Sequence, residues 1–436
     1  MKALPMARSC FFPMLVMLVL GLFTGCDSDN TSEALWPELE PGTPRDEALR
    51  GDVETLVRTL EDVHPAPYAI TPKAAFYAAA QALAEDIPTL QDYEVDVRFA
   101  QLTALLGDSH TTIYPWSAWS LPPILPLRFY AFEDGLFVIS ATTDYQDLLR
   151  ARITHIGEQP VDDALAQVAT LISYENEAWR RALVPRYVVH GRMLHTLGLA
   201  ETPNAVTLSF ETETGASVTR TLPTLTDQSG TIWLSGLEGP VPLQFQSTRG
   251  HYWTTYLPED QTVYFQYNRC LIEPGRPFQD TVDDLVTLLQ THPVDQVVVD
   301  LRHNTGGDSR IIQPLYDLFD SYPPEAQASG RLVVLIGEHT FSSGLMNALE
   351  LHERWNGLLV GTPTGGKPNH YGEVRGFNLA QSRLRVNHST KYFTLLPNAD
   401  PASLNPDIQV PLRAADFFAG RDAALEAVTS SGPSTP

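Results

Sequence analysis

The chain has 436 residues and is strongly acidic, with 52 Asp and Glu side chains, 29 Lys and Arg side chains and a formal net charge of −23. This charge argues against nucleic acid as a partner and against docking on anionic lipid, because both would repel the protein. The length is enough for two or three domains and a sizeable buried core. Beyond the amino-terminal region, the sequence has no apolar run long enough to cross a membrane.

The amino terminus has the pattern of a secretion signal. Lys2 and Arg8 precede an apolar run from Phe11 to Phe23, which is too short to span a bilayer comfortably. The sequence that ends at Cys26 then resembles a bacterial lipobox, in which small residues admit the signal peptidase and the cysteine thiol takes up diacylglycerol. Phe23 stands where a lipobox usually has Leu, which leaves simple cleavage or an uncleaved anchor as alternatives.

We therefore expect an exported lipoprotein of the cell envelope. Residues 1–25 are predicted to be its signal peptide, Cys26 its lipid anchor to the membrane, and residues 26–45 a polar, proline-containing tether. Cys10 would leave with the signal, so Cys270 would be the one remaining thiol and no internal disulfide could form.

Two segments precede the part of the chain that carries the candidate chemistry. Residues 46–117 are predicted to form a helical cap, because apolar residues such as Leu56 and Leu60 follow a helical period. Residues 118–235 contain short apolar or alternating runs and are predicted to form a β-rich module. Within this module, residues 152–161 look like the strand and turn of a PDZ-like domain, although the usual glycine-rich approach to that strand is missing.

Residues 236–428 are predicted to form an α/β domain with a mostly parallel sheet, followed by a flexible tail at residues 429–436. Nearly unbroken apolar runs, which are typical of buried parallel strands, alternate with helical stretches. The predicted strands are residues 263–265, 297–301, 332–336 and 358–360, and the predicted helices are residues 278–289, 311–319 and 345–351. Right-handed crossovers place successive turns at one edge of such a sheet, so the turns at Gly306-Gly307, Ser342 and Lys367 should meet there.

Ser342 and Lys367 form a candidate catalytic pair. A serine hydroxyl is a poor nucleophile until a base accepts its proton. A lysine can be that base only when burial away from carboxylates lowers its pKa from about 10.4 to roughly 7 or 8, and the apolar strand before Lys367 favours such burial. The oxyanion of acyl transfer needs backbone donors, which the amide of Ser343 and an amide of Gly306 or Gly307 can supply.

These motifs make the chain resemble the S41 serine peptidases, the family of the C-terminal processing or tail-specific proteases. The resemblance rests on the 25-residue interval from Ser342 to Lys367 and on two sequence stretches, Asp300-Leu301-Arg302-His303-Asn304-Thr305-Gly306-Gly307 and Thr340-Phe341-Ser342-Ser343-Gly344. It implies a ClpP/crotonase-like catalytic domain, with Ser342 as the nucleophile and Lys367 as the base. It also implies that Gly306 or Gly307, together with Ser343, forms the oxyanion hole.

The resemblance extends to the walls of the predicted cleft. Residues 107–111, Gly-Asp-Ser-His-Thr, look like a recurrent S41 element near the cleft, and residues 406–408 resemble the entry to a late strand of the family. One departure is Leu345, at a position where many tail-specific proteases have glutamate. The possible cleft residues are His110, His370, Tyr371 and Glu373.

The nucleophile and the base each have alternatives. Ser342 could instead cap a helix, and Ser343 could be the nucleophile in its place, although the interval to the lysine favours Ser342. His370, with Glu373 close by, could serve a serine–histidine relay, as histidine does in the tricorn-like branch of the family. His110 is expected to be a structural or cleft-wall residue rather than a catalytic one.

No cofactor is expected. Residues 361–367 fit the P-loop pattern, but Pro368 follows where the hydroxyl that binds Mg²⁺ would stand. No cluster of His, Cys and carboxylate residues has metal-ligand spacing in the sequence.

The sequence as a whole predicts an exported serine endopeptidase that acts on unfolded or loosely ended polypeptides through a Ser/Lys dyad and an acyl-enzyme. The cap and the β-rich module would feed substrate to the sheet edge, where an extended peptide could bind by strand addition. The alternative is a peptide- or ligand-binding protein that keeps the fold without catalysis, which the departure at Leu345 favours.

Overall fold

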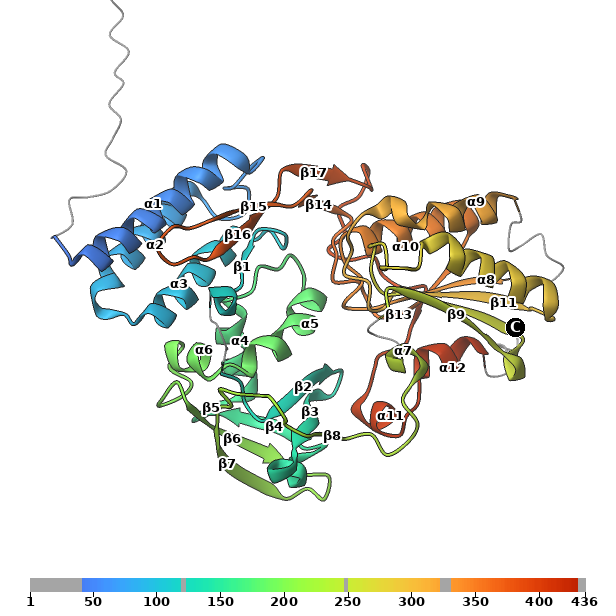
Figure 1. Cartoon of the computed structure of the whole chain (residues 1–436), viewed down its shortest axis with the longest axis horizontal. Helices are drawn as coiled ribbons and strands as arrows, with labels where there is room; N and C mark the ends of the chain where they lie inside the picture. The colour runs from blue at the N-terminus through green and yellow to red at the C-terminus, as the bar shows by residue number, and fades with distance from the viewer. Residues whose placement is uncertain (1–40, 119–122, 247–249, 322–330, 430–436) are drawn as a thin grey trace, which may run out of the picture. The chain divides into compact units, whose positions relative to one another are not determined.

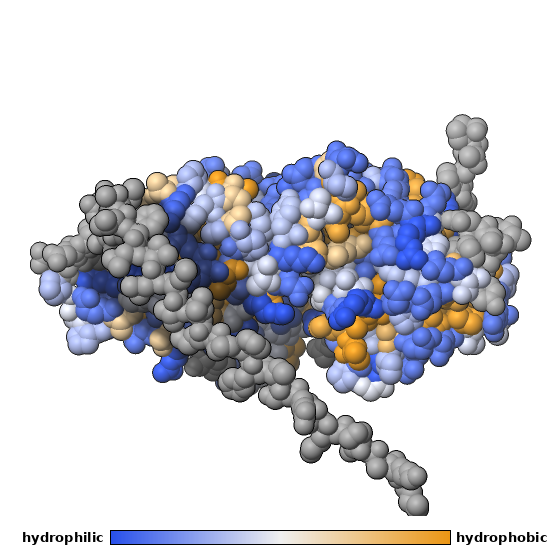
Figure 2. Space-filling view, turned by 90° about the horizontal axis from the view of Figure 1, so that it is seen from above, coloured by the Kyte–Doolittle hydropathy of each residue, from blue (hydrophilic) through white to orange (hydrophobic). Residues whose placement is uncertain are grey.

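The computed structural model describes residues 41–118, 123–246, 250–321 and 331–429. The predicted signal peptide, the lipid-bearing cysteine, most of the tether and most of the flexible tail lie outside these residues. Within the described ranges, no helix combines the length and the apolar character that a membrane span needs. The face drawn in Figure 2 is mostly hydrophilic with smaller hydrophobic patches, in keeping with the charged composition.

The first folded part is helical, as the apolar period indicates. It consists of α1 (Pro44–Val63), α2 (Lys73–Asp86) and α3 (Asp92–Ala104), with a 3-10 turn at Ile87–Thr89. Thr43 and Asp46 form a capping box that fixes the start of α1, where Pro44 stands in the first turn. Leu56 and Leu60, one turn apart on this helix, are fully buried.

The second part is built on an antiparallel sheet with the strand order β2-β3-β4-β6-β7, in which β5 pairs with β4 and β8 pairs with β3. Alternating apolar residues of one strand, such as Val206 and Leu208, point into one core and are fully buried. The strands are β2 (Leu127–Phe132), β3 (Gly135–Thr142), β4 (Arg152–Ile156), β5 (Gln159–Pro160), β6 (Ala205–Glu211), β7 (Ser217–Pro223) and β8 (Trp233–Ser235).

This second part contains more helix than its alternating pattern suggests. Its helices are α4 (Val161–Ala169), α5 (Glu177–Val188) and α6 (Gly191–Thr196), with 3-10 segments at Pro115–Ala118 and Thr143–Leu148. Residues of α5 pack in the same core as the strands. The PDZ-like identity of this part stays a prediction.

The third part is a six-stranded sheet in the order β18-β13-β12-β11-β10-β9, parallel except for β9 at one edge. The predicted mixed α/β fold with a mostly parallel sheet is therefore confirmed, whereas its ClpP/crotonase-like detail stays a prediction. The strands are β9 (Tyr252–Leu257), β10 (Thr262–Tyr267), β11 (Gln296–Asp300), β12 (Arg331–Ile336), β13 (Leu358–Gly361) and β18 (Ile408–Gln409).

Helices cover both faces of this sheet (Figure 1). Successive strand residues point to opposite faces, so Val297 and Val299 pack with the helices of one face, whereas Val298 packs with Leu425 on the other. The first face carries α8 (Phe278–Thr291), α9 (Gln313–Ser321) and α10 (Ser343–Trp355), and the second carries α12 (Ala423–Thr429). Shorter elements are α7 (Leu243–Gln246), α11 (Ala414–Phe418) and 3-10 turns at Pro258–Asp260 and Ser309–Ile312.

The segment after Lys367 forms two antiparallel strand pairs within itself. β14 (Asn369–Gly372) pairs with β17 (Lys391–Thr394), and β15 (Arg375–Asn378) pairs with β16 (Arg385–His388). β16 also pairs with β1 (Thr112–Ile113), which directly follows the Gly-Asp-Ser-His-Thr stretch. This pairing brings that stretch to the segment that follows Lys367.

Asp52 of α1 fastens the helical part to the turn between β15 and β16. Its buried carboxylate accepts hydrogen bonds from the three backbone amides of residues 380–382.

Asp52→Ala should lower the free energy of unfolding by about 1–3 kcal/mol, because these amides lose their acceptor. Urea unfolding measures the change. Glu54→Ala on the same helix should cost at most about 1 kcal/mol, because Glu54 forms a surface ion pair with Arg58. Equal unfolding midpoints for the two variants would contradict this role of Asp52.

Candidate active site

Ser342 stands at a sharp turn between β12 and α10. Its backbone has φ +49° and ψ −125°, a conformation that residues with a side chain rarely adopt and that costs about 1–3 kcal/mol. Ser342 is the residue before α10, but its side chain makes no capping hydrogen bond to the helix. The alternative in which this serine is only a helix cap is therefore disfavoured.

Ser343 differs from Ser342 in that its hydroxyl is engaged. Its Oγ donates a hydrogen bond of 2.7 Å to the carbonyl of Gly307. Its backbone amide faces Gly306, since a Cβ on Gly306 would lie 3.0 Å from the nitrogen of Ser343 and 2.7 Å from the Cβ of Ser342. The absence of a side chain at Gly306, which has φ +99°, is what lets the two loops approach.

The backbone amides of Gly306 and Gly307 differ in whether they are hydrogen-bonded within the protein. The amide of Gly306 donates to Oδ1 of Asn304 at 2.9 Å and is thus occupied. Cys270 holds the same loop in place, because its amide donates to the carbonyl of Gly306 and its carbonyl accepts from Asp308. The amide of Gly307 makes no hydrogen bond to any residue of the described ranges. Of the two glycines, Gly307 is the one with an amide left for a ligand.

The environment of Lys367 differs from the one that a base requires. Its Nζ lies 2.9 Å from Oδ2 of Asp400. Burial by itself would lower the pKa of Lys367, but the hydrogen bond and charge of Asp400, with a smaller contribution from Glu175, raise it above its ordinary value. The prediction that this lysine lies away from carboxylates is wrong, because Asp400, in the segment after β17, pairs with its ammonium group. Its role as a base remains a prediction, which this ion pair disfavours.

Five aromatic rings form a column that passes beside Ser342. Trp179 stacks on Phe341 with ring centroids 4.0 Å apart and planes at 4°. Phe341 in turn stacks on His110 at 4.5 Å, His110 on His370 at 5.3 Å, and His370 on Phe393 at 5.4 Å. We call these five residues the ring column. Through Phe341, the residue before Ser342, the column connects the His110 imidazole to the Ser342 turn.

His110 is a buried histidine with both ring nitrogens unused. Neither Nδ1 nor Nε2 has a hydrogen-bond partner among the described residues, and the side chain is 5% exposed. Burial lowers the pKa of His110 to about 4, against an opposing effect of Asp108. The ring is therefore neutral near pH 7 and able to accept a proton.

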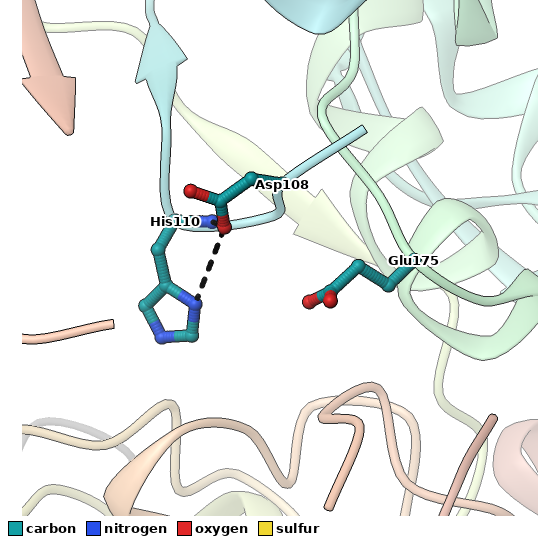
Figure 3. Close-up of side chains that lie close together, drawn as sticks. All are labelled: Asp108, His110 and Glu175. Carbon is teal, nitrogen blue, oxygen red and sulfur yellow. Dashed lines mark hydrogen bonds and ion pairs between the residues drawn. The ribbon is translucent and has the colours of Figure 1, made fainter. Parts of the chain in front are cut away.

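Asp108 faces His110 from two positions earlier in the same loop (Figure 3). Its Oδ1 lies 4.0 Å from Nδ1 of His110 and accepts the backbone amide of the same residue at 2.9 Å. Its Oδ2 accepts from His64, Thr111 and Ser389 at 3.0, 2.5 and 2.6 Å. Burial opposes ionisation, but these hydrogen bonds and the nearby His110 hold the pKa of Asp108 at about 2. The carboxylate is thus a fixed negative charge beside the imidazole.

Glu175 reaches the same place from the second part of the chain, and its carboxyl points toward the loop (Figure 3). It accepts a hydrogen bond from the hydroxyl of Ser109, and burial raises its pKa to about 7. Potential ligand atoms of Asp108, His110 and Glu175 lie within 4.8 Å of one another, a proximity that the sequence spacing does not reveal. Since Asp108 already accepts four hydrogen bonds from the protein, we interpret the cluster as one that orients the histidine.

The other predicted cleft residues contribute unequally. His370 lies in the ring column, its Nδ1 3.2 Å from the carbonyl of Pro368, and burial lowers its pKa. Tyr371 packs against His64 at 5.0 Å. Glu373 is exposed and lies 3.6 Å from Arg375, so it offers His370 no carboxylate partner.

Leu345, the departure from the tail-specific pattern, is a core residue here. It is fully buried in the hydrophobic cluster beneath α10. Its side chain also lies next to Gly366, where an added Cβ would be 3.1 Å from it. A glutamate in this environment would need a partner that the cluster does not contain. Leu345 therefore serves the packing of α10.

Sequence reasoning missed the contribution of residues 175–179. The amide nitrogen Nδ2 of Asn176 donates to the carbonyls of Thr364, Gly365 and Ala402 at 3.2, 3.0 and 2.7 Å. Its Oδ1 caps α5 by accepting from the amide of Trp179, which begins the ring column. No local motif marks these residues, because their partners lie almost 190 or more positions away.

Comparison with known proteins agrees with this geometry. Residues 268–410 match the family model of Peptidase family S41. No curated protein sequence matches the chain. Among solved structures, mature CPAF superimposes with a TM-score of 0.61 at 12% identity, covering 88% of this chain and 97% of CPAF. Mature CPAF complexed with lactacystin gives a TM-score of 0.58 at 13% identity, covering 86% of this chain and 96% of that one.

At these identities the structural likeness shows a shared fold, and the family match supplies the class of enzyme. The match includes the glycine pair, the Ser342 turn and Lys367, whereas His110 and Glu175 lie before it. Residues 268–410 therefore match peptidase family S41, and this match supports a serine-type peptidase.

Proposed function

We propose that this protein is an endopeptidase that cleaves polypeptides through an acyl-enzyme on Ser342. The observation that carries the proposal is the geometry of the turn: a serine with an unengaged hydroxyl, in a strained conformation, next to the amides of Gly307 and Ser343. These two amides would donate to the oxyanion that forms when the hydroxyl attacks a peptide carbonyl. The positive end of α10 adds to that stabilisation.

We propose His110, rather than Lys367, as the general base. At an ordinary pKa near 10.4, only about one lysine in 2,500 is neutral at pH 7, and the ion pair with Asp400 reduces that fraction further. His110 is neutral, buried and next to the residue that precedes Ser342. It would take the hydroxyl proton during attack and return it to the leaving amine, while Asp108 stabilises the imidazolium.

The substrate class that we propose is an unfolded or loosely ended polypeptide, as predicted from the sequence. The family match supports a polypeptide substrate. Strand addition at the sheet edge remains our proposal for how an extended peptide would lie across the Ser342 turn.

The most direct test of this function is mass spectrometry of the chain from Asp27 onward after incubation with a serine-reactive fluorophosphonate and, separately, with an unfolded protein. The wild type should gain one adduct on the peptide that contains Ser342 and should cleave the protein. Ser342→Ala should do neither, while Ser343→Ala should keep both activities within about tenfold. An unreactive wild type would favour the non-catalytic binding protein.

The identity of the base predicts the dependence of labelling on pH. With His110 as the base, the labelling rate should rise as the pH increases through about 4, and should then be level across the neutral range. His110→Ala should lower it by about 10²–10⁴-fold. A base with the raised pKa of Lys367 would instead give about a tenfold increase per pH unit through neutrality, lost in Lys367→Met. Glu175→Gln checks whether a step near pH 7 belongs to Glu175.

The close approach of Gly306 to the Ser342 turn predicts that a side chain at this position slows labelling. Gly306→Ala should reduce the labelling rate by about 10²–10³-fold, because the new methyl group would lie 2.7 Å from the Cβ of Ser342 and displace the amide of Ser343. Gly198→Ala is the matched control, since Gly198 also has a positive φ but has nothing within 4 Å of a Cβ. If both variants label at the rate of the wild type, the amide of Ser343 does not have the proposed role.

We also propose that the enzyme is exported and anchored by lipid on Cys26, as the amino-terminal sequence predicts. In a bacterial host, the full-length chain should then fractionate with membranes, and its mature amino-terminal peptide should carry diacylglycerol. Cys26→Ser should remove both properties. Membrane association that persists without lipid in Cys26→Ser would instead indicate an uncleaved anchor.

A further inference from the structure

An apolar groove lies between the helical part and α4, outside the catalytic residues. It has a volume of about 530 Å³ and is bordered by α2, α3, α4 and the segments at residues 105–107 and 172–174. Ile70, Leu105 and Tyr174 line it and are 68%, 40% and 38% exposed. Large apolar side chains gathered in one concave site mark a surface that another molecule covers.

The groove ends at residues 107–111, which carry Asp108 and His110 and are called the catalytic loop below. Gly107 forms part of its wall and directly precedes Asp108, while Tyr174 directly precedes Glu175. Gly107 has φ +68°, and a Cβ there would lie 2.9 Å from a methyl group of Ile70. The two segments are also fastened to each other, since the hydroxyl of Ser173 donates to the carbonyl of Thr111 at 2.7 Å. The wall of the groove is therefore continuous in sequence with the residues that carry Asp108 and Glu175.

We infer that this groove binds apolar side chains of the polypeptide substrate, on one side of the bond to be cleaved. The inference rests on the proposed function, because it takes the occupant of the groove to be the chain that reaches the catalytic loop. Arg98 is the one cationic side chain of the lining, and it is paired with Asp86 at 3.1 Å. The site therefore suits an apolar segment, such as unfolded proteins expose, and offers little to an acidic ligand.

Binding can be measured without catalysis. In the Ser342→Ala background, the chain from Asp27 onward would be titrated against two fluorescein-labelled peptides of 16 residues, one rich in Leu and Phe and the other with Ser at those positions. The apolar peptide should bind more tightly. Ile70→Ser and, as a second variant at an exposed position, Ala166→Glu should each weaken its binding by about tenfold.

Ile232→Ser is the matched control, because Ile232 is 65% exposed but lies outside the groove. It should leave the affinity for the apolar peptide unchanged. Far-ultraviolet circular dichroism and urea unfolding would confirm that all variants fold. The inference would be overturned if Ile70→Ser and Ala166→Glu bound the apolar peptide as tightly as the parent protein with the unchanged groove.

Two further outcomes separate this inference from the proposed function. If the enzyme with Ser342 intact cleaves unfolded protein but the groove variants bind as the parent does, the groove inference alone fails. If the enzyme neither labels nor cleaves, the proposed function fails, and the peptide titrations still decide whether the groove binds an apolar chain.

Sedimentation tests another occupant of the groove. A dimer that Ile70→Ser breaks would assign the groove to a second copy of this chain and overturn the inference.

Discussion

The arrangement of the active site depends on the ring column. Its five rings come from α5, the turn before Ser342, the loop before β1, β14 and β17, so residues from all across the chain stack in one line. Stacked aromatic pairs contribute about 0.5–1.5 kcal/mol each beyond the area that they bury. The stack determines where the His110 imidazole lies without using either of its nitrogens, which are left for chemistry.

Polar contacts complete what the stack begins. Asp108 accepts the backbone amide of His110 and places a fixed charge beside its ring, while the pairing of β1 with β16 ties the end of this loop to the segment after Lys367. Asn176 binds three carbonyls of the third part and anchors the start of α5, whose Trp179 is the first ring of the column. The site is thus assembled by all three parts of the chain, although the proposed nucleophile and oxyanion donors come from the α/β domain alone.

The parts of this site that local sequence specifies were predictable, and the rest were not. Buried parallel strands read as apolar runs, so the convergence of the glycine pair with the Ser342 turn followed from topology. The partner of Lys367 was missed because Asp400 is 33 residues further along, in a loop without a motif. The position of His110 in the ring column was not predictable for the same reason: its Gly-Asp-Ser-His-Thr context is local, but the rings that stack on it come from distant elements.

The measurement that tests this account most directly is a crystal structure of the enzyme with Ser342 phosphorylated by a fluorophosphonate. If His110 is the base, one of its ring nitrogens should lie within hydrogen-bond distance of Oγ of Ser342. The phosphoryl oxygen should accept hydrogen bonds from the amides of Gly307 and Ser343, and Lys367 should still be paired with Asp400. A structure in which Nζ of Lys367 has left Asp400 and contacts Oγ, with His110 turned away, would contradict the account and restore the Ser/Lys dyad.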